Sequence, residues 1–120
     1  MGRRALRKID STIDLSEHLK TFEQLPNPWD AAALFGRRAA LEVEVGSGKG
    51  LFIRNAAAAR PDTDFLGIEA AKRYAAFAAA GLAKNKLRNA VVVSGDGLRV
   101  FRELLPDLSA TAVHVYFPDP

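Results

Sequence analysis

The stretch from Leu41 to Gly50, LEVEVGSGKG, constrains the fold of this chain more than any other. An apolar-rich run leads into three glycines at alternate positions, and the apolar segment Leu51-Phe52-Ile53 follows at once. This order predicts a strand, a tight loop and a helix. Such a unit presents backbone N–H groups at a helix N-terminus, where an anionic part of a ligand can bind.

The glycine spacing separates this loop from other nucleotide-binding loops. A P-loop needs Gly where Val43 stands and Ser or Thr where Gly50 stands, so Gly48-Lys49 matches it only superficially. A dinucleotide fingerprint needs its third glycine at Leu51, which weakens that interpretation. What remains is an acid, Glu44, before Gly-x-Gly-x-Gly. A carboxylate there repels a pyrophosphate but suits a ligand with an ammonium and a sulfonium, such as S-adenosylmethionine; a glycine-rich turn without a ligand is the alternative.

Composition sets wider limits. With 120 residues, 48% of them hydrophobic, the chain can build one modest core. No apolar run approaches the roughly 18 residues of a membrane span, and the N-terminus has no apolar signal core, so we expect a cytoplasmic protein. The absence of Cys excludes disulfides and thiolate metal sites. The net charge of +3 is compatible with a nucleic-acid partner without requiring one.

The remaining elements alternate along the chain. We expect residues 1–36 to form an N-terminal arm and one short helix, which starts at Pro28 after an Asn27 cap and ends at Gly36. Residues 37–120 should form the start of a larger α/β domain. Its expected strands are 40–45, 65–69, 90–94 and 111–117, and its expected helices are 50–59, 71–86 and 98–105.

Strands that alternate with helices predict a parallel sheet with helices on both faces. Ligands bind such sheets beyond the carboxyl ends of the strands. Each of the four expected strands carries an acid at or near that end, namely Glu44, Glu69, Asp96 and Asp119. One such acid is often only a helix cap or a turn former, but four successive ones indicate a ligand site. Glu42 lies deeper on the same strand face as Glu44, and we interpret it as structural or paired with a basic neighbour.

These pieces together resemble the class I S-adenosylmethionine-dependent methyltransferases, whose fold is Rossmann-like. More narrowly, the chain is similar to the bacterial tRNA (guanine-N7-)-methyltransferases. The glycine loop with Glu44, the strand FLGIE that ends at Glu69, the turn Gly95-Asp96-Gly97 and the segment VYFPDP carry the resemblance. The last of these is the most specific, because that family reads Phe-Pro-Asp-Pro-Trp at this place.

The resemblance implies roles for individual residues. Gly46, Gly48, Gly50 and the four acids would bind S-adenosyl-L-methionine. Glu69 would accept both ribose hydroxyls, Glu44 would hold the methionine ammonium, and Asp96 would accept from the adenine amino group. Asp119 would contact the cofactor and also act as the catalytic residue, where the methyl donor meets guanine N7.

The resemblance also implies partners and limits. The expected partner is tRNA, with no membrane, no metal, and a monomer favoured. A full methyltransferase sheet has seven strands, so we expect this chain to be truncated after the fourth and inactive by itself. Two alternatives stay open: a methyltransferase with another class of substrate, and a non-catalytic RNA-binding scaffold of the same fold.

Overall fold

The fold centres on a parallel β-sheet. The computed structural model describes residues 6–104 and 112–115. In this part of the chain the sheet has the strand order β1-β4-β3-β2-β5, and every strand pair is parallel. The strands are β1 (Leu19–Thr21), β2 (Ala40–Val45), β3 (Thr63–Glu69), β4 (Ala90–Ser94) and β5 (Ala112–Val115). The Rossmann-like α/β fold predicted from the sequence is therefore confirmed.

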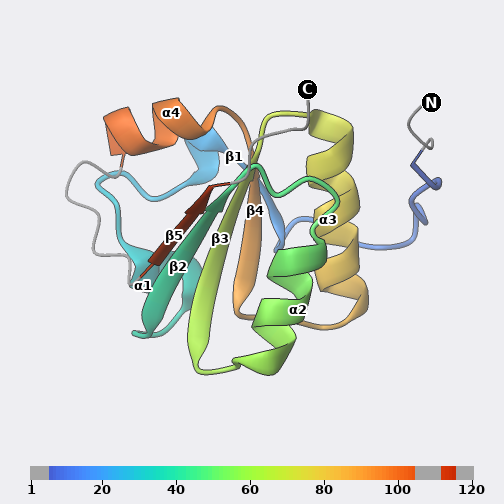
Figure 1. The fold of residues 1–120 in the computed structure, drawn as a ribbon, viewed down its shortest axis with the longest axis horizontal. Coiled ribbons are helices and arrows are strands. Elements are labelled where there is room, and N and C mark those ends of the chain that lie inside the picture. The colour runs from blue at the N-terminus through green and yellow to red at the C-terminus, as the bar shows by residue number, and fades with distance from the viewer. Residues whose placement is uncertain (1–5, 105–111, 116–120) are drawn as a thin grey trace.

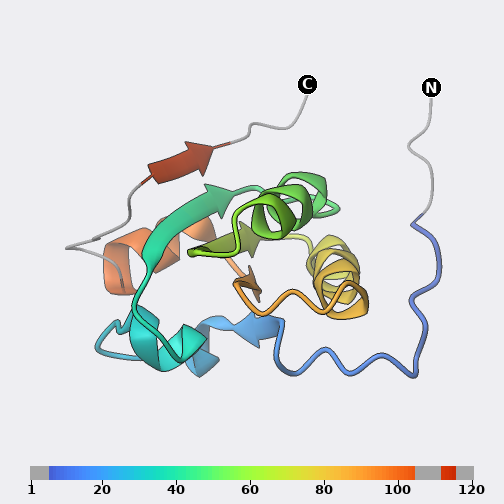
Figure 2. The same ribbon diagram turned by 90° about the horizontal axis from the view of Figure 1, so that it is seen from below.

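Helices cover both faces of the sheet (Figures 1 and 2). One face carries α2 (Leu51–Ala59) and α3 (Lys72–Lys84), whose apolar side chains pack with Phe65 and Val92. The other face carries α1 (Ala31–Phe35), the short α4 (Gly97–Arg99) and the π-helical turn η2 (Val100–Leu104). Successive side chains of a strand point to opposite faces, and β3 and β4 carry buried apolar side chains on both, as a sheet between helices requires.

Two predicted helices differ from the observed ones at their boundaries. The first begins at Ala31 rather than at Pro28, because the Asp30 carboxylate, not Asn27, accepts hydrogen bonds from the Ala32 and Ala33 amides. Its end at Gly36, with φ 75°, is as predicted. The helix predicted over 98–105 is split into the three residues of α4 and the π-helical turn η2.

The strand β1 was not predicted. Its three residues pair with β4 in the register Leu19↔Val92 to Thr21↔Ser94 and so extend the sheet at one edge. A single turn of 3₁₀ helix, η1 (Phe22–Gln24), follows it. Three residues are too few to show an alternating pattern, so only the pairing with β4 identifies this segment as a strand.

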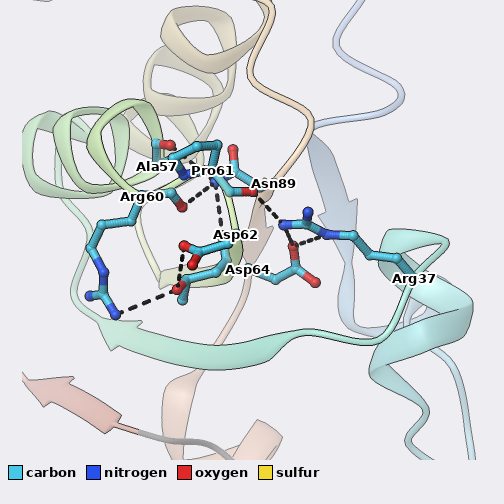
Figure 3. A network of polar contacts seen from close by, with 8 residues as sticks. Arg37, Ala57, Arg60, Pro61, Asp62, Asp64 and Asn89 are labelled. Carbon is cyan, nitrogen blue, oxygen red and sulfur yellow. Dashed lines mark hydrogen bonds and ion pairs between the residues drawn. The ribbon is translucent and has the colours of Figure 1, made fainter.

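A network of polar contacts closes the amino-terminal end of the sheet (Figure 3). The side-chain nitrogen of Asn89, the residue before β4, lies 2.9–3.1 Å from the carbonyl oxygens of Ala57, Arg60 and Thr63. Beside it, the Arg37 guanidinium donates to the buried Asp64 carboxylate at 2.7 and 3.0 Å and to the Pro61 carbonyl at 2.8 Å. These contacts tie the end of α2 to β3 and β4.

Candidate functional site

The glycine loop joins β2 to α2 at the carboxyl end of the sheet. Gly46, Gly48 and Gly50 all have positive φ, at 82°, 56° and 83°. A side chain at Gly48 would meet nothing within 4 Å, so this part of the loop is open to an approaching ligand. A Cβ at Gly50 would lie 2.6 Å from the Cβ of Ala78. Gly50 therefore permits close packing of the loop on α3.

Glu44 lies beneath this loop and is 4% exposed. Its Oε1 atom has no hydrogen-bond partner among the described residues, and neither has the buried Oγ atom of Ser47. Burial raises the pKa of Glu44, and the nearby Glu69 carboxylate adds to the rise. The Ser47 hydroxyl and His114 act in the opposite direction, although the hydroxyl does not reach hydrogen-bonding geometry. A buried carboxylate without a partner is costly unless a ligand satisfies it.

Glu69 ends β3, the strand next to β2, and connects the glycine loop to the start of α3. Its Oε1 atom accepts from the Gly48 amide at 2.7 Å, and its Oε2 atom accepts from the Ala71 amide at 2.8 Å. Each carboxylate oxygen has two lone pairs, so both can accept a further hydrogen bond. The side chain is only partly buried, and it is therefore placed to bind hydroxyl groups of a ligand.

Asp96 lies in the turn after β4, beside these two acids. The Gly95 amide donates to the Glu69 carbonyl at 3.0 Å, and Gly97 packs against Val45 at the end of β2. The Asp96 carboxylate itself accepts from the Leu98 amide at 2.9 Å, which makes it the cap of α4. The structure thus brings three of the four predicted acids together at the carboxyl end of the sheet. The fourth, Asp119, lies outside the described residues.

Glu42 behaves differently from Glu44, although both lie on the same strand face. Its carboxylate contacts the Arg60 guanidinium at 2.6 Å and the Nε2 atom of His114, on β5, at 2.9 Å. Burial alone would raise the pKa of Glu42, but the hydrogen bonds from His114 and Arg60 outweigh it and lower that pKa. The prediction that Glu42 pairs with a basic neighbour is confirmed.

Ser47 was missed by sequence reasoning as a member of this site. A Cβ at Gly67 in β3 would lie 2.4 Å from the Ser47 Oγ atom. The absence of a side chain at Gly67 therefore makes the space in which the hydroxyl sits under the loop. A glycine inside a strand often marks such a close approach, so Gly67 was the signal that could have pointed to Ser47.

The described residues contain no helix long and apolar enough to cross a membrane. They also contain no group of three or more His, Asp or Glu side chains that could hold a metal ion.

Comparison with known proteins identifies the family. Residues 38–120 match the model of a family described as "Putative methyltransferase". The chain belongs to this family. The resemblance inferred from the glycine loop and the strand ends is thereby confirmed.

Curated relatives agree with this family. Over its whole length, the chain is 47% identical to a tRNA (guanine-N(7)-)-methyltransferase of Rhodopirellula baltica, and the match covers 46% of that protein. It is 33% identical, over 98% of its length, to 55% of the protein of the same name from Yersinia enterocolitica. The chain thus spans about half the length of these relatives. Among solved structures, a crystal structure of an MtNAS mutant matches this chain with a TM-score of 0.54 and 17% sequence identity. The match covers 75% of this chain and 33% of the other chain. At this identity it supports the fold alone.

Proposed function

We propose that the complete protein containing this chain transfers a methyl group from S-adenosyl-L-methionine to N7 of a guanine in tRNA. One observation carries the proposal most directly. The Oε1 atom of the buried Glu44 has no hydrogen-bond partner among the described residues and lies beneath a glycine loop, in a chain whose relatives are named tRNA (guanine-N(7)-)-methyltransferases.

The residues at the carboxyl end of the sheet fit this cofactor. The ammonium of its methionine part would satisfy the Glu44 Oε1 atom and offset the cost of burying a carboxylate. Ser47 would supply a hydroxyl beside it. The open face of Gly48 would let the cofactor approach the loop backbone closely.

The ribose and adenine would bind along the ends of β3 and β4. Glu69 would accept both ribose hydroxyls while it keeps its bonds to the Gly48 and Ala71 amides. This is the role that an acid after the second strand plays in dinucleotide folds. The Asp96 carboxylate caps α4 through one oxygen, and its exposed side chain leaves an oxygen for the adenine amino group.

The proposed reaction requires no proton transfer to the protein before the methyl group is attacked. When bound, S-adenosylmethionine supplies a methyl group activated by a sulfonium. Guanine N7 has a free lone pair, so no base has to remove a proton before attack, and the protein mainly aligns the two reactants. The base gains positive charge as the C–S bond breaks and the N–C bond forms. We assign to Asp119 the stabilisation of this charge and a hydrogen bond to the guanine edge.

The test uses the complete protein with labelled S-adenosylmethionine and unmodified tRNA, followed by digestion and mass identification of the nucleosides. We expect 7-methylguanosine, greatly reduced by Asp119→Ala, while Asp119→Ala leaves the melting temperature close to that of the wild type. An unchanged turnover in the Asp119→Ala protein would remove Asp119 from the mechanism.

The same experiment separates the alternatives. Cofactor binding without labelled tRNA would indicate a methyltransferase with another class of substrate. Binding of tRNA without cofactor binding would indicate a non-catalytic scaffold. A monomeric state and a cytoplasmic location remain our expectations, to be checked by light scattering and by cell fractionation.

A further inference from the structure

Two cavities adjoin at the amino-terminal end of β4, the end of the sheet remote from the glycine loop. One, of about 530 Å³, lies between β1, α1 and the start of β4. The other, of about 440 Å³, lies between the ends of α1 and α2 and the turn from α3 to β4. Phe35 and Arg88 line both cavities, so the two form one continuous surface.

The rim of this surface carries positive charge. Lys20 and Arg88 line the first cavity, and Lys86 and Arg88 line the second. None of these three takes part in an ion pair between described residues. The Lys20 ammonium donates to the Ser16 carbonyl at 2.8 Å. Glu17 is the single acid in the wall of the first cavity, and the second cavity has none. The rim therefore attracts anions.

Lys86 adopts a backbone conformation that is uncommon for residues other than glycine. With φ 55°, it has the only positive φ of a non-glycine residue in the described part of the chain. It follows α3 in the position where glycine usually ends a helix, and the Leu87 amide donates back to the Leu82 carbonyl at 3.1 Å. Glycine would be more stable there. Lys86 is exposed and lines the second cavity, so its charge is available to a ligand there.

The floor beneath these cations is rigid. Asn89, next to Arg88, is 8% exposed and its side chain is held by three carbonyl oxygens. Arg37, which also lines the second cavity, is held by Asp64 and by the Pro61 carbonyl (Figure 3). The surface is therefore preformed, and binding does not have to order its backbone.

We propose that this basic double cavity, defined by Lys20, Phe35, Lys86 and Arg88, binds the backbone of an RNA. A phosphate would lie against Lys86 and Arg88, and the ribose or base of the same nucleotide would lie against the Phe35 ring. Cations beside an apolar wall match the two parts of a nucleotide. The inference rests on the proposed function, because the RNA would be the tRNA substrate.

The location suits a contact that positions the RNA without taking part in the reaction. The five residues of β4, at about 3.3 Å each, separate the two ends of the sheet by roughly 15 Å. One RNA molecule can therefore reach both the proposed cofactor site, at the carboxyl end of the sheet, and the basic double cavity. Phosphate contacts fix the register of a nucleic acid and carry no sequence information, so this surface would raise affinity without selecting a base.

The test measures tRNA affinity of the complete protein over a series of salt concentrations. We expect Lys86→Ala with Arg88→Ala to weaken tRNA binding about tenfold and to reduce the slope of log affinity against log salt by about 1 to 2. Cofactor affinity and turnover at saturating tRNA should not change. Lys84→Ala is the matched control, because Lys84 is an exposed cation two residues from Lys86 and lines neither cavity.

Lys86→Gly gives a second test that a loss of folding cannot imitate. It removes the charge and the backbone strain together, so the melting temperature should rise by about 2 to 4 °C while tRNA affinity falls severalfold. If the Lys86 and Arg88 variants bind tRNA as the Lys84→Ala protein does, the inference is wrong. A wild-type protein that neither binds nor methylates tRNA would instead contradict the proposed function. Reduced binding to anionic vesicles with unchanged tRNA binding would assign the surface to a membrane and overturn the inference.

Discussion

The two ends of the sheet treat buried polar groups in opposite ways. At the amino-terminal end, Asn89 and Asp64 are buried, and their side chains are held by backbone carbonyls and by Arg37. At the carboxyl end, Glu44 and Ser47 are equally buried, but Glu44 Oε1 and Ser47 Oγ have no partner among the described residues. The amino-terminal end has one exception: Nδ1 of His18 has no partner among the described residues, although Nε2 of the same ring lies 2.6 Å from the Leu87 carbonyl oxygen.

Under the proposed function, this difference separates residues that hold the fold from residues that would bind the cofactor. A satisfied buried polar group contributes about 1 kcal/mol to stability, whereas an unsatisfied one costs about 1 to 3 kcal/mol. Glu44 and its strand neighbour Glu42 make the contrast within one element. Four predictions test it.

The largest expected effect is on cofactor binding. Glu69→Ala removes a carboxylate that would make two hydrogen bonds to the ribose, each worth about 1.5 kcal/mol, so cofactor affinity should fall about 100-fold. Isothermal titration of the complete protein with S-adenosylmethionine measures it. Asp62→Ala, an exposed acid at the opposite end of β3, is the control and should bind as the wild type does. Equal affinities for all three proteins would exclude Glu69 from the cofactor site.

The next effect concerns the satisfied end. Asn89→Ala leaves three carbonyl oxygens without their shared donor and should lower the free energy of unfolding by about 2 kcal/mol. Urea denaturation measures this loss. Asn55→Ala, which alters an exposed residue of α2, should change it by less than about 0.5 kcal/mol. A similar loss in both variants would show that the network has no special weight.

Glu44→Gln and Glu42→Gln should change stability in opposite directions. The first removes a buried charge whose Oε1 atom has no partner among the described residues. It should stabilise the free protein by about 1 kcal/mol and weaken cofactor binding about tenfold. The second breaks the contacts with Arg60 and His114 and should destabilise by about 1 kcal/mol. Thermal denaturation of the two variants in parallel decides the sign, and a destabilised Glu44→Gln protein would mean that Glu44 is a structural acid.

The smallest effect is on pH dependence. Because the pKa of Glu44 is raised, its protonated form favours the fold, and that contribution is lost as pH rises through the folded pKa. Glu42 has a lowered pKa, so its contribution is present at neutral pH and is lost only as pH falls through that pKa. Ammonium binding needs ionised Glu44, and we therefore expect cofactor affinity to fall severalfold as the pH falls through the raised pKa of Glu44.

The Glu44→Gln protein supplies the control for this pH series. Its residual cofactor affinity should vary much less over the same interval. A wild-type affinity that is independent of pH would show that the Glu44 carboxylate does not pair with the cofactor ammonium.

The sequence predicted most elements because their patterns are long. The strand before the glycine loop and the helices over 50–59 and 71–86 lie within about two residues of β2, α2 and α3. The start of α1 was wrong because Asn27 and Asp30 are both good caps, and only the hydrogen bonds to Asp30 distinguish them. The strand β1 was missed because long-range pairing, not local pattern, makes it a strand.

Part of the geometry of the candidate site could also be predicted from local sequence patterns. Position at a strand end was enough to predict that Glu44, Glu69 and Asp96 lie together at the carboxyl end of the sheet. It could not show that Asp96 also caps α4, or that Ser47 occupies the space beside Gly67. The buried pairing of Glu42 needed a partner from β5, whose distance from β2 no local pattern can reveal.

The strand order also sets an order of folding. Contacts among the central strands join nearby parts of the chain, such as Asn89 and Thr63, which are 26 residues apart. The contacts at the two edges, His114 with Glu42 and His18 with Leu87, are separated by 72 and 69 residues. Closing these longer loops costs about 1 kcal/mol more in chain entropy. The centre of the sheet should therefore assemble first, and β1 and β5 should dock last.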